Sequence, residues 1–368
     1  MQLAPGVRKI SAKLSKMATF LRLSDLTSVT CSPETPTHEV LRRLNESDYL
    51  FFIVIDCTGK PLGTITDGDV RRAMLDGATL NDPSSRCMFH QSCFGQLGND
   101  TENIKILQKV PFLPLVDSDG TLVEVLIPNG NTPRLKTALV MAGGRGIRLG
   151  ERTRNTPKPL LSVGDQPILE RIISNLEEAG VENIFVSVHY LANQIRSFLE
   201  TRSSTASFQV IEESKMLGTA GAIGLLPAGL SQPVLVINGD LVTQTNFLAL
   251  NHFHWRHSYD ASVAVAQHDT QVPFGVVQKD KDGLFLSIEE KPVIRNFVAA
   301  GIYFLSPEFC ALVPKNVPFD MPDLLNRGRG IGLKVGLFPI HEPWIDVGRP
   351  DDLKRADESY NSRENKQK

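Results

Sequence analysis

A glycine-rich segment followed by two cationic side chains gives this sequence its clearest chemical signal. The apolar run at residues 138–141 has the character of a buried parallel strand and opens directly into the segment 142–146, with Arg148 and Lys158 further along. Glycine has no Cβ, so backbone N–H groups can approach a polyphosphate closely. Arginine adds a planar fork of donors, and lysine adds a point charge. The segment therefore predicts a phosphate-binding loop, although the glycines alone would also fit a tight strand-to-helix turn.

The candidate nucleotide-binding residues of this loop are Ala142, Gly143, Gly144 and Gly146. Their spacing is neither GxxxxGK[ST] nor GxGxxG, which argues against a Walker-type loop and against a dinucleotide-binding fold.

Two aspartates, far apart in the chain, each follow an apolar segment. Asp240 comes after the run 234–238, and Asp346 lies within the segment 343–348. Ligands of α/β sheets bind beyond the carboxyl ends of the strands, so a carboxylate there can reach phosphates or a metal ion. Asp240 alone could instead cap the next helix.

An alternation of strands and helices would bring the glycine loop and the two aspartates together. The hydrophobic pattern of the sequence predicts such an alternation. Apolar spacing predicts helices at 168–179 and 191–199 and buried strands at 184–188, 208–212 and 234–238. The order indicates an α/β fold with a Rossmann-like, doubly wound sheet.

The segment 24–128 reads as a separate module of two similar halves. The first half has a helix at 37–45, strands at 50–56 and 61–66, and a helix that opens at Asp67. The second half has a helix at 103–109 and strands at 112–117 and 122–127. We predict a leader at 1–17, this module at 18–130, a linker at 131–135, a second domain at 136–360 and a tail at 361–368.

Length and composition narrow the class of protein. The chain has 368 residues, a formal net charge of −2 and 22% charged residues, which gives no support for binding nucleic acid or a membrane surface. The leader is basic without a continuous apolar core, so it reads as an amphipathic helix or a disordered segment, with Met17 as an alternative start. Five scattered cysteines without a CxxC pair favour reduced thiols in a cytoplasmic protein.

The full pattern GGxGxRL followed by PKPLL resembles the signature of sugar-1-phosphate nucleotidylyltransferases. The match departs at Ile147, where the family usually has Thr, and at residues 150–153, where xPLT is usual. The resemblance covers about residues 136–356 and implies a GT-A-like domain. It implies that Asp240 and Asp346 hold Mg²⁺, and that Arg148 and Lys158 contact the phosphates of the NTP.

Two further clusters match the same family. The segment LGTAGA follows a strand and is expected to begin a helix of small residues; the resemblance places Gly218, Thr219 and Ala220 against the nucleobase and favours GTP, with UTP, CTP or dTTP as alternatives. Taken alone, this segment would also fit close helix packing. In the sugar-binding half, the resemblance implies roles for Gly275, Glu290, Lys291 and Gly301, with Lys291 on the sugar phosphate.

The N-terminal module resembles a pair of CBS motifs. Thr66 and Asp69 form the T-x-x-D element that holds a ribose and phosphate in such modules, and the second half has no such pair. One adenine-nucleotide site is therefore implied, with a docking or dimer surface as the alternative. The whole chain resembles guanylyltransferases that prepare amino-sugars for nonulosonic acid synthesis.

The expected activity is transfer of a nucleoside monophosphate from an NTP to a sugar 1-phosphate, with release of pyrophosphate. A non-catalytic protein that senses nucleotides or sugar phosphates is the alternative. A homo-oligomer is expected, without nucleic-acid or membrane partners. Outside these motifs, His252, His254 and His257 are expected on a solvated helix face, and Arg327 and Arg329 as loop charges.

Overall fold

A computed structural model of the chain describes residues 7–8, 20–47, 49–107, 110–128 and 134–367. The chain divides into two compact units, Met1–Thr132 and Pro133–Lys368. Most of the expected leader, including Met17, and most of the expected linker lie outside the described residues.

The first half of the N-terminal unit is a three-stranded sheet with two helices packed on it. Its elements are β3 (Thr30–Cys31), α1 (Thr37–Glu46), β4 (Phe51–Ile55), β5 (Pro61–Thr66) and α2 (Asp67–Leu75). β3 runs parallel to β4, and β4 runs antiparallel to β5. Val40 and Leu44 of α1 and Val70 of α2 form a buried core with Phe52 and Ile65 of the sheet. The helix and both strands predicted here are confirmed to within a residue at each end.

The second half repeats this order. Its elements are β6 (Gly95–Gln96), α3 (Asp100–Leu107), β7 (Leu113–Val116) and β8 (Leu122–Pro128). β6 runs parallel to β7, β7 antiparallel to β8, and the sheet continues through β2 (Phe20–Leu23) to β1 (Val7–Arg8). The two halves share a small core in which the rings of Phe51 and Phe112 stack with centroids 3.9 Å apart.

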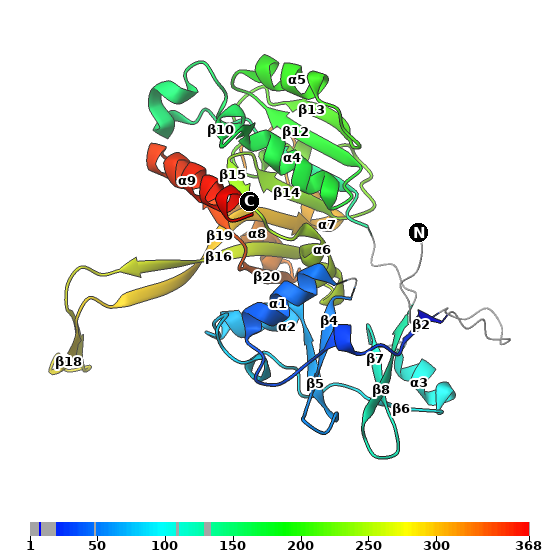
Figure 1. Cartoon of the computed structure of the whole chain (residues 1–368). Helices are drawn as coiled ribbons and strands as arrows, with labels where there is room; N and C mark the ends of the chain where they lie inside the picture. Colours follow the sequence, from blue (N-terminus) through cyan, green and yellow to red (C-terminus); the bar gives the residue numbers. More distant parts are fainter. Residues whose placement is uncertain (1–6, 9–19, 48, 108–109, 129–133, 368) are drawn as a thin grey trace. The chain divides into compact units, whose positions relative to one another are not determined.

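The C-terminal unit is built on a seven-stranded sheet within residues 134–367 (Figure 1). Its strands, in spatial order, are β13 (Ser207–Glu212), β12 (Asn183–Val188), β9 (Thr137–Met141), β14 (Val234–Asn238), β19 (Val293–Leu305), β16 (Ala261–Gln271) and β20 (Val335–Ile340). The first four are parallel, and β19 is antiparallel to both of its neighbours. The strand order reverses at β9, which has β12 on one side and β14 on the other. This confirms the predicted α/β sheet and sets its switch point between β9 and β14.

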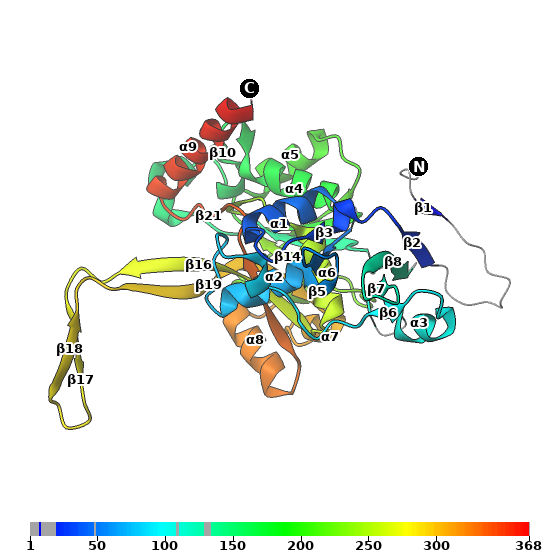
Figure 2. The same ribbon diagram turned by 60° about the horizontal axis from the view of Figure 1, so that its bottom comes forward.

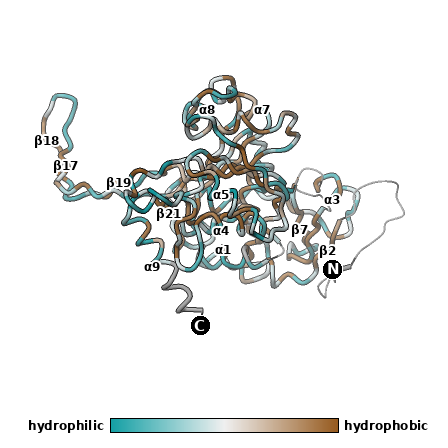
Figure 3. Tube along the Cα trace, turned by 90° about the horizontal axis from the view of Figure 1, so that it is seen from above, coloured by the Kyte–Doolittle hydropathy of each residue, from teal (hydrophilic) through white to brown (hydrophobic). Residues whose placement is uncertain are grey.

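Both faces of this sheet are covered. Ala138 and Val140 of β9 belong to one core together with α4 (Ile168–Glu178), α5 (Ala192–Thr201) and α6 (Phe247–Arg256). The intervening Leu139 is also fully buried, from the opposite face. α7 (Pro307–Cys310) and α8 (Met321–Gly330) lie on the side opposite α4 (Figure 3). The last helix is α9 (Pro350–Gln367).

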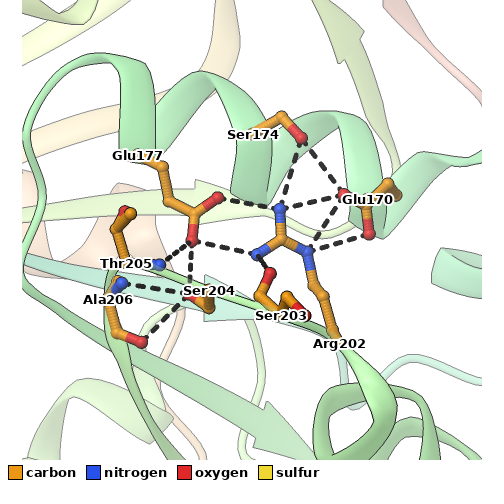
Figure 4. A network of polar contacts seen from close by, with 8 residues as sticks. All are labelled: Glu170, Ser174, Glu177, Arg202, Ser203, Ser204, Thr205 and Ala206. Atoms are coloured by element: carbon orange, nitrogen blue, oxygen red, sulfur yellow. Dashed lines mark hydrogen bonds and ion pairs between the residues drawn. The ribbon is translucent and has the colours of Figure 1, made fainter.

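Arg202 ties the segment between α5 and β13 to α4 (Figure 4). Its guanidinium donates to both Glu170 and Glu177 over 2.8–3.0 Å, and Glu177 also accepts from Ser204 and the Thr205 amide. The hydrogen bonds from Arg202 lower the pKa of Glu177 to about 2. The network therefore fixes the β12–β13 side of the sheet.

A long two-part arm projects from the other side of the sheet (Figures 1 and 2). The inner halves of β16 and β19 are buried in the sheet, while their outer halves pair with each other alone, up to Gln271 opposite Val293. The arm continues into a hairpin of β17 (Val276–Lys279) and β18 (Phe285–Glu289). The hairpin lies at the far end, clear of the sheet and its helices.

Two expectations about charged side chains are wrong. His254 is 2% exposed rather than solvated, and its Nδ1 lies 3.0 Å from the hydroxyl of Ser262. The sequence of this turn of α6 is largely polar. The turn nevertheless faces the sheet, because Phe253 and His254 are both buried in the core. Arg327 and Arg329 are exposed, but they belong to helix α8 rather than to a loop.

The five cysteines lie in the described part of the chain and are free thiols. Across that same part, the structure has no helix with the length and apolar character needed to span a membrane.

Burial of His254 predicts a pH-dependent stability of the C-terminal unit. Desolvation lowers the pKa of His254 to about 4, whereas the unfolded chain has the ordinary value near 6.5. As pH falls from 7.5 to 5 the unfolded state takes up a proton that the folded state does not, so the free energy of unfolding drops by about 2 kcal/mol from this group. Urea unfolding followed by tryptophan fluorescence measures it, because both tryptophans, Trp255 and Trp344, lie in this unit.

His254→Gln is expected to reduce that pH dependence. His252→Gln is the control, because His252 is exposed on the same helix. An equal pH dependence in wild type and His254→Gln would contradict the assignment.

Candidate active site

The glycine-rich segment lies at the switch point of the sheet, directly after β9. Ala142 is buried, and its amide donates to Ser187 O over 2.9 Å. A Cβ added to Gly143 would lie 2.8 Å from Oε1 of Glu213, whereas a Cβ on Gly144 would meet nothing within 4 Å. Gly146 has a φ of +63° and begins the 3₁₀ helix Ile147–Thr153. A side chain at Gly143 would therefore press against Glu213, whereas the backbone of Gly144 is open to an approaching ligand.

Lys158 lies between the two aspartates. It begins the short 3₁₀ helix Lys158–Leu160 and is 7% exposed. Its Nζ forms an ion pair with Oδ2 of Asp240 and lies 3.9 Å from Oδ1 of Asp346. The structure therefore brings together three predicted residues that are far apart in the sequence.

A two-stranded ladder sets the distance between the aspartates. β15 (Leu241–Thr243) pairs with β21 (Trp344–Asp346), which places Leu241 opposite Asp346. The amide of Val347 donates to Asp240 O over 3.1 Å. Asp240 itself follows β14, whose end lies beside the end of β9, because the Gly239 amide donates to Met141 O over 2.9 Å.

The two aspartates place like charges close together, and cationic side chains offset part of that charge. Burial raises the pKa of Asp346, and the charge of Asp240 adds to the rise, while Lys158 and Arg148 oppose it. Oδ1 of Asp240 is buried and has no hydrogen-bond partner among the described residues. Mg²⁺ takes one or two carboxylates and completes its shell with water and phosphate oxygens. The orphaned oxygen and the paired carboxylates fit that ion, although no cluster of three or more acidic, histidine or cysteine ligands occurs in the described part of the chain.

Arg148 is exposed and approaches the same place from the loop. Its guanidinium lies against Gly348, where an added Cβ would be 3.4 Å from Nη1 and Nη2. It is thus available for a ligand beside Asp346.

The segment 217–220 pairs with the chain just before α8. Thr219 donates through its amide and its hydroxyl to Oδ1 of Asp320, and the Ala220 amide donates to Phe319 O. Gly218 has a φ of +77°. These residues lie in a loop rather than in a helix, which begins only at the 3₁₀ turn Gly221–Leu225.

Two carboxylates that shape the site were not identified from the sequence. Buried Glu213 lies against Gly143 and accepts from the Leu217 amide over 3.0 Å, so it joins the glycine loop to the 217–220 segment. It directly follows strand β13, the same signal that singled out Asp240. Asp320 precedes a helix with Pro322 in its first turn, a pattern that marks a helix start and gives no hint of its contact with Thr219.

The candidate sugar-binding residues lie in two separate places, the sheet and the arm. Gly301 lies in the buried half of β19 with a φ of +73°, and a Cβ there would be 2.6 Å from Nδ2 of Asn238. Gly275 and Glu290 are neighbours on the arm, since a Cβ on Gly275 would lie 3.0 Å from Oε2 of Glu290. Lys291 follows them with a φ of +48°. Within a single chain these three arm residues are separated from Lys158, Asp240 and Asp346.

Thr66 and Asp69 form a capping box at the start of α2. Asp69 accepts from the amide of Thr66 over 2.8 Å and from its hydroxyl, and its other oxygen pairs with Arg72. A cavity of 350 Å³ adjoins Asp69. Its lining includes Arg72, Asp76 and Arg86.

The structure is that of an α/β protein with a glycine-rich loop at a sheet switch point, beside a lysine held by two aspartates. The chain belongs to the nucleotidyl transferase family, which matches residues 137–363. A CBS domain matches residues 23–76, the half that contains Thr66 and Asp69.

The chain is similar to two curated relatives. It is 30% identical to "Mannose-1-phosphate guanylyltransferase catalytic subunit beta" of Drosophila pseudoobscura pseudoobscura, over 61% of this chain and 62% of the relative. It is 30% identical to "Probable mannose-1-phosphate guanylyltransferase 1" of Oryza sativa subsp. japonica, over 58% of this chain and 62% of the relative. The chain thus spans about three fifths of the length of these relatives. A solved structure of HddC from Yersinia pseudotuberculosis complexed with GMP-PN is 26% identical, covering 61% of this chain and 99% of that one, with a TM-score of 0.47.

Alanine substitutions at Gly143 and Gly144 are expected to have opposite effects on stability and on NTP binding. Gly143→Ala pushes a Cβ against the buried carboxylate of Glu213, so it should lower the thermal stability of the C-terminal unit by about 1–3 kcal/mol. Gly144→Ala meets no atom and should leave stability unchanged while weakening NTP binding, because its Cβ occupies the open side of the loop. Thermal unfolding and calorimetric NTP titration of the two variants test this. Unchanged NTP affinity in Gly144→Ala would contradict the placement of the phosphates.

Proposed function

We propose that the C-terminal domain transfers a nucleoside monophosphate from an NTP, with GTP preferred, to a sugar 1-phosphate, giving an NDP-sugar and pyrophosphate. The observation that carries the proposal is Lys158 held between Asp240 and Asp346 beside the glycine loop. Membership of the nucleotidyl transferase family supports it, as does the similarity to mannose-1-phosphate guanylyltransferases.

The reaction is an in-line displacement at the α-phosphorus. An oxygen of the sugar 1-phosphate forms a new P–O bond, the bond from the α-phosphorus to the bridging oxygen breaks, and pyrophosphate leaves with the bonding electrons. The attacking phosphate is already ionised near pH 7, so no general base is required. The residues of the chain would then act by positioning and by stabilising charge.

Each site residue has a role in this scheme. The loop amides and Arg148 would hold the pyrophosphate side of the NTP, and Lys158 would contact the triphosphate. Lys291 would hold the sugar phosphate, Glu290 the sugar hydroxyls, and Gly275 and Gly301 would offer backbone groups.

Asp240 and Asp346 are the carboxylates that would hold Mg²⁺, whose charge offsets that of the phosphates when it is bound. Oδ1 of Asp240, buried and without a hydrogen-bond partner in the described part of the chain, supports this assignment.

The choice of GTP rests on the segment 217–220 and on the guanylyltransferase names of the relatives. The same chemistry with UTP, CTP or dTTP is the alternative within the enzyme class, and a sensing protein without turnover is the alternative outside it. A cytoplasmic location is part of the proposal, supported by the five free thiols.

Pyrophosphate release, assayed over four NTPs and a panel of sugar 1-phosphates, tests the proposal directly. Wild type should turn over with GTP and at least one sugar 1-phosphate. Asp240→Asn and Asp346→Asn keep the side-chain shape but remove a charge, and each should lower kcat by about 10²–10³ at saturating Mg²⁺. Asp165→Asn is the control, because Asp165 is an exposed aspartate of the same domain. Near wild-type turnover in either active-site variant would overturn the metal assignment.

We further propose that the cavity beside Asp69 binds one adenine nucleotide. Arg72 and Arg86 line it and would face the phosphate, and its volume of 350 Å³ lies within the usual range of ligand pockets. If the nucleotide regulates the enzyme, it must bind two conformations with different affinities.

Calorimetry of the full chain with AMP, ADP and ATP tests this nucleotide site. Asp69→Ala should abolish binding but also breaks the capping box, at a cost of about 1 kcal/mol. Arg86→Gln leaves that box intact and should weaken binding about tenfold, whereas Arg42→Gln, an exposed arginine of α1 outside the cavity lining, should not. No heat with any of the three nucleotides would leave the module as a docking or dimer surface.

A further inference from the structure

The arm, defined as residues 267–298, exposes an unusual amount of apolar surface. Eight of its large apolar side chains are between 49% and 72% exposed. They are Phe274, Val277, Leu284, Phe285, Leu286, Ile288, Val293 and Ile294. In Figure 3 brown, apolar stretches lie along the β17–β18 hairpin. Large apolar side chains gathered in such number on one exposed element indicate an interaction site.

The described part of the chain does not bury this surface. Beyond the sheet the arm is a ribbon of two strands, and among the described strands β17 and β18 pair only with each other. Val277 lies opposite Ile288 in that pairing, so their side chains share one face of the hairpin without a layer above them. Two-stranded ribbons are marginally stable alone, which means that this one needs a partner surface.

The charges of the arm indicate what kind of partner this is. Four cationic and five anionic side chains alternate along it, from Asp269 to Arg295. A strongly basic or acidic partner would meet as much repulsion as attraction. A second copy of this chain, with a formal net charge of −2, has no large excess of either sign, and a two-fold arrangement makes each contact between the two copies twice.

The position of Lys291 is a second, independent reason to expect a contact with another copy of the chain. Glu290 and Lys291 follow β18 on the arm, while Lys158 and the two aspartates lie at the sheet switch point. Lys291 has a φ of +48°, a conformation that costs a non-glycine residue about 1 kcal/mol or more. Strained backbone conformations cluster at functional sites. Within one chain, however, Lys291 lies on the arm, away from Asp240 and Asp346.

We propose that the arm packs against a second copy of this chain and brings Glu290 and Lys291 to that copy's carboxylate pair. Each active site is then built from the sheet of one copy and the arm of the other. The role of Lys291 in this arrangement rests on the proposed function.

Mixed dimers test the shared site. Asp240→Asn disables the sheet side and Lys291→Ala the arm side, so each variant alone should lose at least 95% of pyrophosphate release. Co-expression with two different affinity tags yields dimers that contain one copy of each variant. Such a dimer has one site with both residues intact, so it should recover about half of the wild-type activity. If each site uses its own arm, neither site is intact and nothing is recovered.

The dimer contact has its own test. Light scattering should show wild type as a dimer or a higher even assembly. The double variant Phe285→Asp/Ile288→Asp should be monomeric and inactive, with an unchanged thermal transition of the C-terminal unit. Ile331→Asp replaces an equally exposed isoleucine outside the arm and should leave mass and activity unchanged.

The outcomes separate the two proposals. Wild type without pyrophosphate release on any substrate pair overturns the proposed function, while the light-scattering result still decides whether the arm joins two copies. An active wild type whose mixed dimers recover nothing, or whose Lys291→Ala variant stays active, overturns the shared site. A monomeric wild type, or a double variant that stays dimeric, overturns the contact.

Discussion

The arrangement of the C-terminal domain depends on holding two carboxylates and one ammonium group close together at the edge of a sheet. Partial burial raises the pKa of Asp346, and repulsion by the like charge of Asp240 adds to that rise. Lys158 offsets one of the two negative charges, and its low exposure strengthens the interaction. One negative charge and one oxygen of Asp240 without a hydrogen-bond partner among the described residues remain, and both fit the proposed binding of a divalent cation.

The fold supplies this arrangement through backbone pairing rather than through the side chains themselves. The β15–β21 ladder brings the two aspartates together across 106 residues of sequence, because Leu241 pairs with Asp346. The strand reversal at β9 places the glycine loop at the carboxyl ends of β9 and β14, where ligands of such sheets bind. Buried Glu213 lies against Gly143, and Asp320 accepts from Thr219, so carboxylates also set the positions of the neighbouring loops.

The sequence predicted the strands, most helices and the loop because their signals are local. Buried parallel strands read as apolar runs, and glycine next to such a run marks a turn. Burial of His254 could not be read in the same way, because the turn from His252 to His257 mixes polar and aromatic residues. Contacts of α6 with the sheet, such as that of His254 with Ser262 of β16, show which side faces inward. The partner of Thr219 likewise lies 101 residues away, beyond any local pattern.

The arm separates residues that belong to one motif cluster in the sequence. Gly301 and Lys291 are ten residues apart and belong to the same motif cluster, yet one is buried at the edge of the site and the other stands on the arm. They are joined by β19, a strand whose inner half packs in the core and whose outer half forms one side of the arm. The same strand therefore reaches from the exposed arm to Gly301, where an added Cβ would lie 2.6 Å from Nδ2 of Asn238, the last residue of β14. Because Asp240 comes two residues after Asn238, one continuous strand and one close contact connect the arm with the aspartate pair.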